Sequence, residues 1–371
     1  MVQKRNLKKM AQSLLNTQIT TMLGSRYPIF GFAHQIDVVV EVTLAGGIGI
    51  FGGTRNTPEE ITEALAEISS RVGELPFGID LVLPKNMPEK NNREDIEAQL
   101  PDAHRNFVDH LYEKYDVPRD NIPGARSRFV RSEEVARNQL DAVLRSDAKI
   151  FAMGVGSPPE MVGAAKEYGK FVLSLVGAPR HAQHALDAGA DMIVAQGYDA
   201  GAHTGEIGTF SLVPQIVDLV AGKVPVLAAG GVATGRHIAA ALALGAEGVW
   251  MGTPWLTTKE HNTSPKMLNQ LLNAGSNDTV RSRSDSGKTL RMIKSAWSEE
   301  WETEGNPKPL QMPYHDILVG DLLGSINRNE VEPLMHQPAG QGIAFFNEVR
   351  TVRETMEAFV MDATAVLERS R

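Results

Sequence analysis

Eight short runs of apolar and β-branched residues alternate along this chain with amphipathic segments of helical length. The strand candidates cover residues 28–32, 47–51, 77–83, 149–153, 171–176, 192–196, 224–229 and 248–252. The helix candidates between them cover residues 58–72, 132–144, 158–168, 179–188, 211–220 and 235–244. Such alternation implies parallel strands that are joined by right-handed helical crossovers. Eight candidates favour an α/β fold of the closed (β/α)8 type, a TIM barrel, over an open doubly wound sheet.

Two stretches do not fit a bare barrel. Residues 84–131 are polar and rich in proline around a helix candidate, which predicts an insertion after the third strand. That insertion is either a lid or substrate wall over the active-site face, or a surface excursion. The strand and helix alternation stops after residue 260, so we assign residues 1–260 to the barrel domain. Residues 261–371 are expected to form a mostly helical extension that packs on the barrel.

The composition excludes several classes of function. With 42% hydrophobic and 22% charged residues, the 371-residue chain has the make-up of a globular protein with a large core. Its net charge of −8 disfavours nucleic acid as a partner, and the absence of cysteine removes thiolate chemistry and iron–sulfur clusters. No run is long and apolar enough to span a membrane, and the chain begins without a secretory signal. We therefore expect a cytoplasmic protein with a small-molecule substrate; a homo-oligomer is compatible with the sequence.

Two neighbouring strand candidates end in glycine. Gly230-Gly231 follows one strand and precedes a helix candidate, while Gly252-Thr253 stands one strand–helix unit later. Glycines let the backbone approach an anion, and the amides at a helix start favour phosphate. Phosphate capture after strands seven and eight recurs in barrels, so this spacing predicts a phosphate site. The alternative is that glycine merely terminates these strands.

His203 stands out among the ten histidines. It lies between Gly201 and Gly205, in a loop directly after a predicted buried strand. The flanking glycines suggest that the backbone comes close to a ligand, and histidine exchanges a proton near neutral pH. The hypothesis is a catalytic or substrate-contacting role, against a structural hydrogen-bonding role. His34 also follows a strand end and is a weaker candidate for substrate contact.

Other chemistries lack their motifs. The sequence has no His-x-x-x-His or His-Glu-x-x-His, so no metal site is predicted. It has no Gly-x-Ser-x-Gly for serine hydrolysis. The glycine pattern at residues 46–52 is interpreted as a strand and turn rather than a dinucleotide fingerprint. A tightly held flavin is therefore favoured over a nicotinamide-binding domain.

These motifs resemble those of the nitronate monooxygenase family, FMN-dependent barrels that also include enoyl-acyl-carrier-protein reductases and NADH:quinone reductases. The resemblance covers about residues 20–259 and returns weakly at residues 337–341. Family members typically read Gln-Gly-x-Glu-Ala-Gly-Gly-His, where this chain has Gln196-Gly-Tyr-Asp-Ala-Gly-Ala-His203. By that match, Gln196 and Gly201 contact FMN and His203 is the catalytic histidine.

The same resemblance implies the remaining FMN contacts, which are Asp80, Gly230, Gly231, Trp250, Met251, Gly252 and Thr253. The glycine pair holds the FMN phosphate, and the segment from Trp250 to Thr253 completes that cradle. The chain departs from the family pattern in three places. Asp80 stands where members have an amide, Ala202 replaces a glycine beside the histidine, and residues 31–34 read Gly-Phe-Ala-His instead of Gln-Gly-Met.

Three functions follow from these patterns. As a nitronate monooxygenase, the chain would use FMN and O2 to convert an alkyl nitronate into a carbonyl compound and nitrite, with His203 as the base or as the group that stabilises the nitronate. As an NAD(P)H-dependent FMN reductase, it would act on a quinone or an enoyl thioester, with His203 orienting or protonating the acceptor. As a noncatalytic barrel, it would bind flavin or phosphate without turnover.

Overall fold

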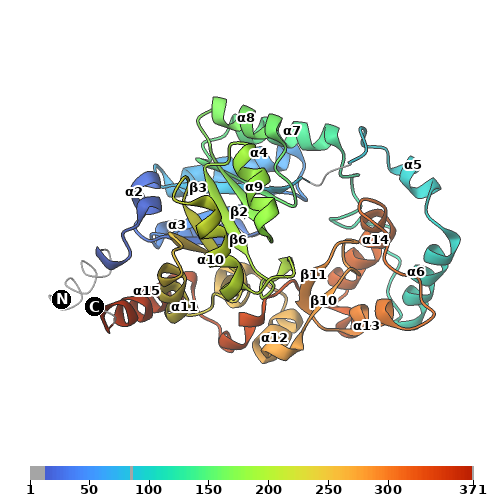
Figure 1. Cartoon of the computed structure of the whole chain (residues 1–371). Coiled ribbons are helices and arrows are strands. Elements are labelled where there is room, and N and C mark those ends of the chain that lie inside the picture. The colour runs from blue at the N-terminus through green and yellow to red at the C-terminus, as the bar shows by residue number, and fades with distance from the viewer. Residues whose placement is uncertain (1–12, 84–86, 370–371) are drawn as a thin grey trace.

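Eight parallel strands close into a barrel in the order β1-β2-β3-β4-β5-β6-β8-β9, in a computed structural model that describes residues 13–83 and 87–369 (Figure 1). The strands are β1 (Ile29–Ala33), β2 (Ile48–Gly52), β3 (Phe77–Val82), β4 (Ile150–Gly154), β5 (Phe171–Val176), β6 (Met192–Gln196), β8 (Val226–Ala229) and β9 (Gly248–Met251). The predicted α/β barrel is confirmed, and every predicted strand is present with its ends within two residues. The first residues assigned to the barrel domain (1–12) and to the insertion (84–86) lie outside the described residues.

Helices cover the outside of this barrel. They are α3 (Ile36–Leu44), α4 (Pro58–Val72), α7 (Glu133–Leu144), α8 (Pro159–Glu167), α9 (Pro179–Asp187), α10 (Thr209–Val220), α11 (Gly235–Ala243) and α15 (Val352–Arg369), with α2 (Gln18–Leu23) before the first strand. Helix α4 shows why such segments are readable from sequence. The Thr57 hydroxyl accepts from the Glu60 amide, the Glu60 carboxylate accepts from the Thr57 amide, and Pro58 occupies the first turn.

Helix α3 is a barrel helix that the sequence analysis did not predict. Its run of β-branched residues has low helix propensity and looks like a strand. Val38, Val39 and Val42 are fully buried in the main core. Burial of one apolar face against the barrel therefore outweighs the local preference of these residues.

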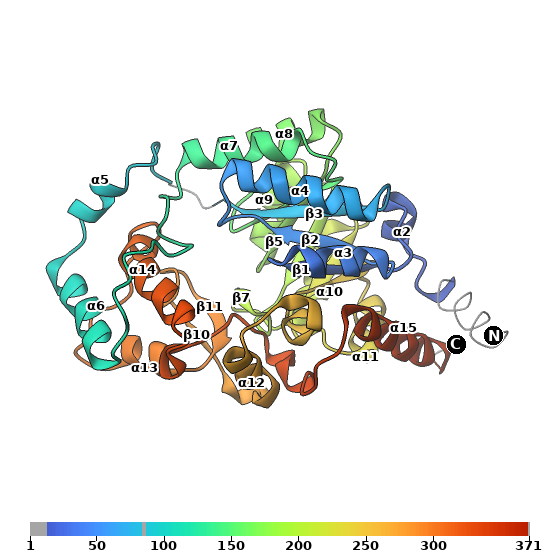
Figure 2. The ribbon, with the colours of Figure 1, turned by 180° about the vertical axis from the view of Figure 1, so that it is seen from behind.

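The eighth barrel helix, α15, comes from the far end of the chain. About a hundred residues separate it from β9, yet it packs against α11 and α3 (Figures 1 and 2). The segment that we assigned to the C-terminal extension thus supplies a helix in the barrel wall. The rest of that segment contains two strands as well as helices.

The insertion and most of the extension lie beside the barrel (Figure 2). They share a second hydrophobic core. We call residues 87–131 and 262–346 the cap. Its elements are α5 (Arg93–Ala98), α6 (Asp102–Lys114), α12 (Pro265–Asn273), β10 (Thr279–Ser282), β11 (Leu290–Ile293), α13 (Ala296–Glu302) and α14 (Tyr314–Arg328). Phe107 of α6 meets the fully buried Trp301 of α13 edge to face, with ring centroids 4.8 Å apart. Two segments far apart in sequence therefore form one unit.

The cap holds a loop of the barrel by strand pairing. Strand β7 (Ala202–His203), in the loop after β6, pairs antiparallel with β11, and β11 pairs with β10. Leu290 of β11 lies opposite His203. The Arg291 guanidinium donates to the Tyr198 carbonyl at 3.2 and 3.1 Å and lies over the Tyr198 ring. The loop that carries His203 is thus fixed to the cap as well as to the barrel.

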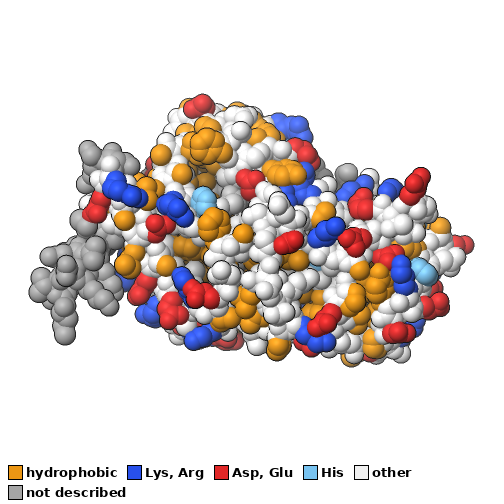
Figure 3. All heavy atoms as spheres, turned by 90° about the horizontal axis from the view of Figure 1, so that it is seen from below, with side chains coloured by type: hydrophobic (Ala, Val, Ile, Leu, Met, Phe, Trp, Pro, Cys, Tyr) orange, Lys and Arg blue, Asp and Glu red, His pale blue; other side chains and the backbone are white. Residues whose placement is uncertain are grey.

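The outer surface carries no single sign of charge on the face shown in Figure 3, where acidic and basic side chains alternate with scattered apolar ones. Among the described helices, none is long and apolar enough to cross a membrane.

A glycine contact joins the two halves of the cap and gives a first prediction. A Cβ added at Gly124 would lie 1.8 Å from the Gly320 carbonyl oxygen of α14. We expect Gly124→Ala to separate these segments and to lower the free energy of unfolding by about 1–3 kcal/mol. Urea unfolding followed by tryptophan fluorescence measures this change, because Trp297 and Trp301 lie in the cap core.

Gly163→Ala is the matched control, since a Cβ at Gly163 in α8 meets nothing within 4 Å. Alanine inside a helix is favoured over glycine by about 0.5–1 kcal/mol, so this variant should be neutral or slightly more stable. Equal stabilities of the two variants would show that the contact at Gly124 does not hold the cap together.

Candidate active site

A cavity of about 2210 Å³ lies between the carboxyl ends of the barrel strands and the cap. Barrel loops line one side of it, and Arg126, Arg131, Lys288 and Gln337 of the cap line the other. Every residue that the sequence analysis placed in the site borders this cavity, namely His34, Asp80, Gln196, Gly201, His203, Gly230, Gly231, Trp250, Met251, Gly252 and Thr253. The structure therefore brings the predicted residues, which come from five barrel strands and the loops that follow them, to one place.

The glycine pair after β8 has the backbone that a close-approach site needs. Gly230 and Gly231 have φ angles of +95° and +70°, a region that other residues rarely adopt. A Cβ at Gly230 would lie 2.8 Å from the Thr209 hydroxyl and 3.0 Å from the Ala200 amide nitrogen. The chain itself fills the space where a side chain would stand, so packing requires glycine at position 230, and the pair leaves bare backbone at the start of helix α11.

The glycines beside His203 have a packing reason. A Cβ at Gly201 would lie 2.8 Å from the backbone of Ala339 and Gly340, and one at Gly205 would lie 2.5 Å from the Gly177 carbonyl oxygen. The Gly340 amide also donates to the Thr253 hydroxyl at 2.9 Å. The chain itself fills the space beside these glycines, so they do not need a ligand to explain them.

His203 is a half-buried, uncharged imidazole. Burial lowers its pKa to about 3, and the guanidinium groups of Arg126 and Arg131 contribute to that shift. Its Nε2 lies 2.8 Å from the Ser286 hydroxyl, and the Gln196 side-chain amide donates to its carbonyl at 2.7 Å. These two contacts fix the ring and the backbone. Sequence reasoning missed Ser286 because it lies 83 residues from His203 in a loop without a recognisable motif.

His34 is also uncharged and oriented. Its Nδ1 donates to the Gly52 carbonyl at 2.7 Å, and its ring meets Phe32 edge to face at 5.3 Å. Burial and the charge of Arg55 lower its pKa to about 4, although the hydrogen bond to Gly52 opposes that shift. Phe32 in turn stacks on Trp250 with ring centroids 5.8 Å apart. The floor of the cavity near β1 and β9 is therefore aromatic.

Asp80 has an unusual environment for a carboxyl group. It lies on β3, is 6% exposed, and its Oδ1 is buried without a hydrogen-bond partner among the described residues. Burial raises its pKa to about 7. A protonated carboxyl offers both a donor and an acceptor, and so does a side-chain amide. Asp80 in that form fits a ligand that an asparagine would bind, and the unpartnered oxygen together with the glycine cradle fits a flavin nucleotide.

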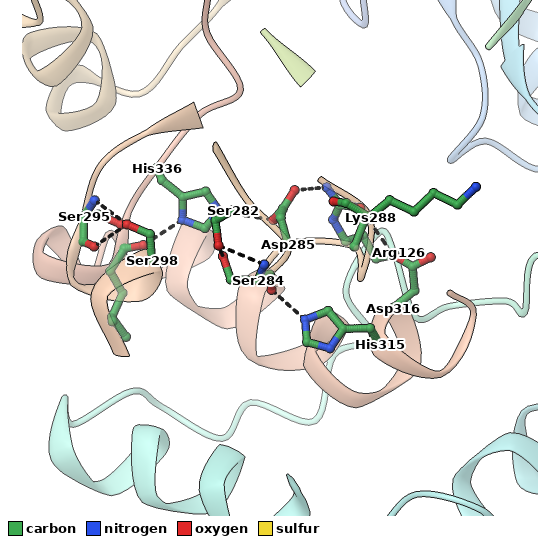
Figure 4. Close-up of polar contacts among 12 residues, drawn as sticks. Arg126, Ser282, Ser284, Asp285, Lys288, Ser295, Ser298, His315, Asp316 and His336 are labelled. Atoms are coloured by element: carbon green, nitrogen blue, oxygen red, sulfur yellow. Dashed lines mark hydrogen bonds and ion pairs between the residues drawn. The ribbon is translucent and has the colours of Figure 1, made fainter. Parts of the chain in front are cut away.

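A buried ion network supports the cap side of the cavity (Figure 4). Arg126 pairs with Asp285 and, at 3.3 Å, with Asp316, and these side chains are between 4% and 9% exposed. Burial alone would raise the pKa of Asp285, but Arg126 and His336 hold it far below its usual range. His336 Nε2 lies 3.1 Å from Asp285 Oδ1, and His315 Nε2 donates to the Ser284 carbonyl at 2.7 Å. The network fixes the loop that carries Ser286.

Metal binding has no structural support in residues 13–83 and 87–369. No group of three or more His, Asp or Glu side chains in these ranges is arranged to hold a metal ion.

Known proteins resemble this chain over nearly its whole length. The family model described as "Nitronate monooxygenase" matches residues 19–362. "Putative monooxygenase Rv1533" of Mycobacterium tuberculosis is 40% identical, over 92% of this chain and 95% of its own. A "Probable nitronate monooxygenase" of Staphylococcus aureus is 30% identical, over 87% of this chain and 91% of its own.

Solved structures share the fold. The nitroalkane oxidase from Streptomyces ansochromogenes has a TM-score of 0.79 and 22% identity, over 95% of this chain and 99% of that one. FabK from Thermotoga maritima has a TM-score of 0.74 and 25% identity, over 96% and 98%. The family match makes the protein an oxidoreductase with a flavin cofactor and a small-molecule substrate. The chain belongs to the nitronate monooxygenase family.

Proposed function

We propose that the protein uses FMN and O2 to oxidise alkyl nitronates to a carbonyl compound and nitrite. The observation that carries this proposal is the His203 imidazole, which Ser286 orients and which lines the same cavity as the guanidinium groups of Arg126 and Arg131. A nitronate is an anion, and cations in a buried cavity stabilise it relative to the neutral nitroalkane. The same anion would raise the pKa of His203 when it binds, because it offsets the positive charges nearby.

The residues of the cavity would divide the work of binding. Gly230 and Gly231 would hold the FMN phosphate, and the segment from Trp250 to Thr253 would complete its cradle. Asp80, Gln196 and Gly201 would contact the flavin. The bound flavin supplies the acceptor for the electrons of the substrate.

His203 would act on the proton of the substrate. If its Nε2–H donates to the Ser286 hydroxyl, Nδ1 is the free acceptor. Nδ1 would then take the α-proton of a neutral nitroalkane, and the resulting imidazolium would stabilise the nitronate that forms. His34 would bound the substrate space next to Phe32.

The second candidate function is an NAD(P)H-dependent FMN reductase that acts on a quinone or an enoyl thioester. The similarity to FabK supports this candidate function. The enoyl reductase domain of MlnA shares the fold, with a TM-score of 0.65 and 14% identity. His203 would then orient or protonate the acceptor.

Anaerobic stopped-flow absorbance separates the two functions. Flavin-loaded protein is mixed with either an alkyl nitronate or NADH. Fast bleaching by the nitronate alone supports the monooxygenase, and fast bleaching by NADH alone makes the protein a reductase. A colourless protein that does not take up FMN would overturn both.

His203→Ala should keep the flavin but lower kcat/KM for a nitroalkane by about 10²–10⁴-fold, because a positioned proton acceptor contributes that much. Steady-state kinetics measure the effect. His110→Ala, at an exposed position of α6 in the cap, is the control and should behave as wild type. Wild-type kinetics of the His203 variant would remove this residue from the mechanism.

Gly231→Val should weaken FMN binding by about tenfold or more. Valine is strained at the positive φ of this position, and its branched side chain would enter the space of the phosphate. The flavin-to-protein ratio and a titration of apoprotein with FMN measure this. Gly222→Val carries a similar strain, at φ +73° in open space outside the cavity, and should leave the FMN affinity unchanged. Equal FMN affinities of the two variants would contradict the cradle.

Asp80 predicts a pH-dependent stability of the flavin-free protein. Because burial raises the pKa of Asp80 to about 7, the folded protein binds a proton that the unfolded chain has released. Wild type should therefore lose stability relative to Asp80→Asn as the pH rises from about 4 to about 7, by about 4 kcal/mol at most. Urea unfolding of both proteins at pH 5 and pH 8 tests this. A difference between them that is independent of pH would mean that Asp80 is ionised throughout.

A further inference from the structure

The neighbours of Asp80 in the barrel offer its carboxyl group no partner. It stands on β3, opposite Gly52 of β2 and Ala152 of β4 in the strand register. Neither neighbour has a polar side chain, and a Cβ added at Gly154 would still lie 3.9 Å from Asp80 Oδ1. That oxygen is buried without a hydrogen bond among the described residues, although Asp80 borders the cavity. Because an unpartnered buried oxygen costs free energy, the arrangement favours a polar ligand group in the cavity.

Among the described residues, no charged group holds the carboxyl of Asp80 in its ionised form. The charged and titratable side chains that border the cavity from the neighbouring elements and from the cap are His34, Arg55, Arg126, Arg131, Glu133 and Glu160. None of these contributes to the raised pKa of Asp80, which burial alone causes. The flavin-free cavity therefore holds a carboxyl group that changes its charge near neutral pH.

The strand order puts Asp80 on the side of the barrel opposite the proposed phosphate cradle. That cradle follows β8, and β4, β5 and β6 separate β8 from β3 on one side, while β2, β1 and β9 separate them on the other. The ribityl chain of FMN lies between its phosphate and its ring. A phosphate held after β8 would therefore direct the ring across the barrel mouth, and Asp80 would meet the ring rather than the phosphate.

The flavin ring has a chemistry that suits a neutral acid. Its carbonyl oxygens and unprotonated ring nitrogens accept hydrogen bonds, which tune the electronic properties of the cofactor. A protonated carboxyl can donate to such an acceptor, whereas a carboxylate can only accept. A carboxylate would also place its negative charge against these acceptors and lose its hydration when the ring covers it. The ring therefore selects the protonated form of Asp80.

We propose that Asp80 binds the flavin ring as a neutral acid, so that FMN binding above neutral pH takes up a proton from solvent. The proton stays on the carboxyl group, and no other bond is made or broken. This inference rests on FMN as the proposed cofactor, but not on a nitronate as the substrate. An amide, which family members carry at this position, keeps its donor at every pH. The affinity of this chain for FMN is instead full at low pH and falls as the pH rises through the pKa of Asp80.

Equilibrium titrations of the apoprotein with FMN at pH 6 and pH 9 test this. With the pKa of Asp80 at about 7, binding of the protonated form alone raises the wild-type Kd by about 100-fold between these values, and we expect a rise of at least about tenfold. Asp80→Asn keeps a donor and should lack this increase. The FMN phosphate titrates near pH 6 in both titrations, so the comparison of the two proteins cancels its effect.

Asp187→Asn is the matched control. It removes an exposed carboxylate that borders the same cavity, and it should keep the wild-type pH dependence. An equal pH dependence of the Kd in wild type and Asp80→Asn would overturn the proposal.

Calorimetry measures the proton in the wild-type protein itself. FMN is titrated into apoprotein at pH 8 in two buffers of different ionisation enthalpy, and the difference between the heats gives the number of protons taken up. We expect about 0.9 proton per FMN for wild type and Asp187→Asn, and less than about half of that for Asp80→Asn. If wild type takes up the proton while no nitronate is oxidised, the proposed function fails and the role of Asp80 stands. FMN binding without proton uptake, or no FMN binding at either pH, would overturn the inference.

Discussion

The pairing of β7 with β11 is the contact on which the rest of the site depends. Two residues of a barrel loop, Ala202 and His203, add a strand to a sheet of the cap. The loop between β10 and β11 is itself held in place, because Asp285 in this loop contacts Arg126 and His336 of the cap. The imidazole is therefore positioned by an element that does not belong to the barrel. A barrel without this cap would keep the glycine pair after β8 and lose the contacts that orient the histidine.

Charge is distributed unevenly between the surface and the interior. The chain has a net charge of −8, and the face in Figure 3 mixes both signs, while the cap side of the cavity gathers guanidinium and ammonium groups. The histidines near these groups stay uncharged because burial and the nearby cations both disfavour the imidazolium. The pKa of the buried carboxyl of Asp80, on the strand that pairs with β2, is shifted in the opposite direction by burial alone. His34 and His203 are thus uncharged, whereas the guanidinium and ammonium groups beside them keep their charge.

The sequence predicts the parts of this protein that local rules control. Alternating strand and helix patterns located all barrel strands, and capping residues such as Thr57 marked a helix start. Helix α3 was not predicted, because the local preference of its valines is for a strand and only their burial against the barrel makes the helix stable. Ser286, Arg126 and Arg131 escaped for another reason: they join the site only after two segments more than a hundred residues apart have packed together. A local sequence pattern does not reveal such a long-range contact.

Helix α15 has a consequence for how the chain is made. It completes the barrel wall between α11 and α3, yet it follows both halves of the cap in the sequence. Synthesis on the ribosome proceeds from the N-terminus, so the strands emerge well before the helix that covers their last junction. Until α15 has been synthesised, the apolar faces of α3 and α11 that it covers are exposed to water or bound by chaperones. The barrel of this protein is therefore completed late, after the cap that covers its mouth has been synthesised.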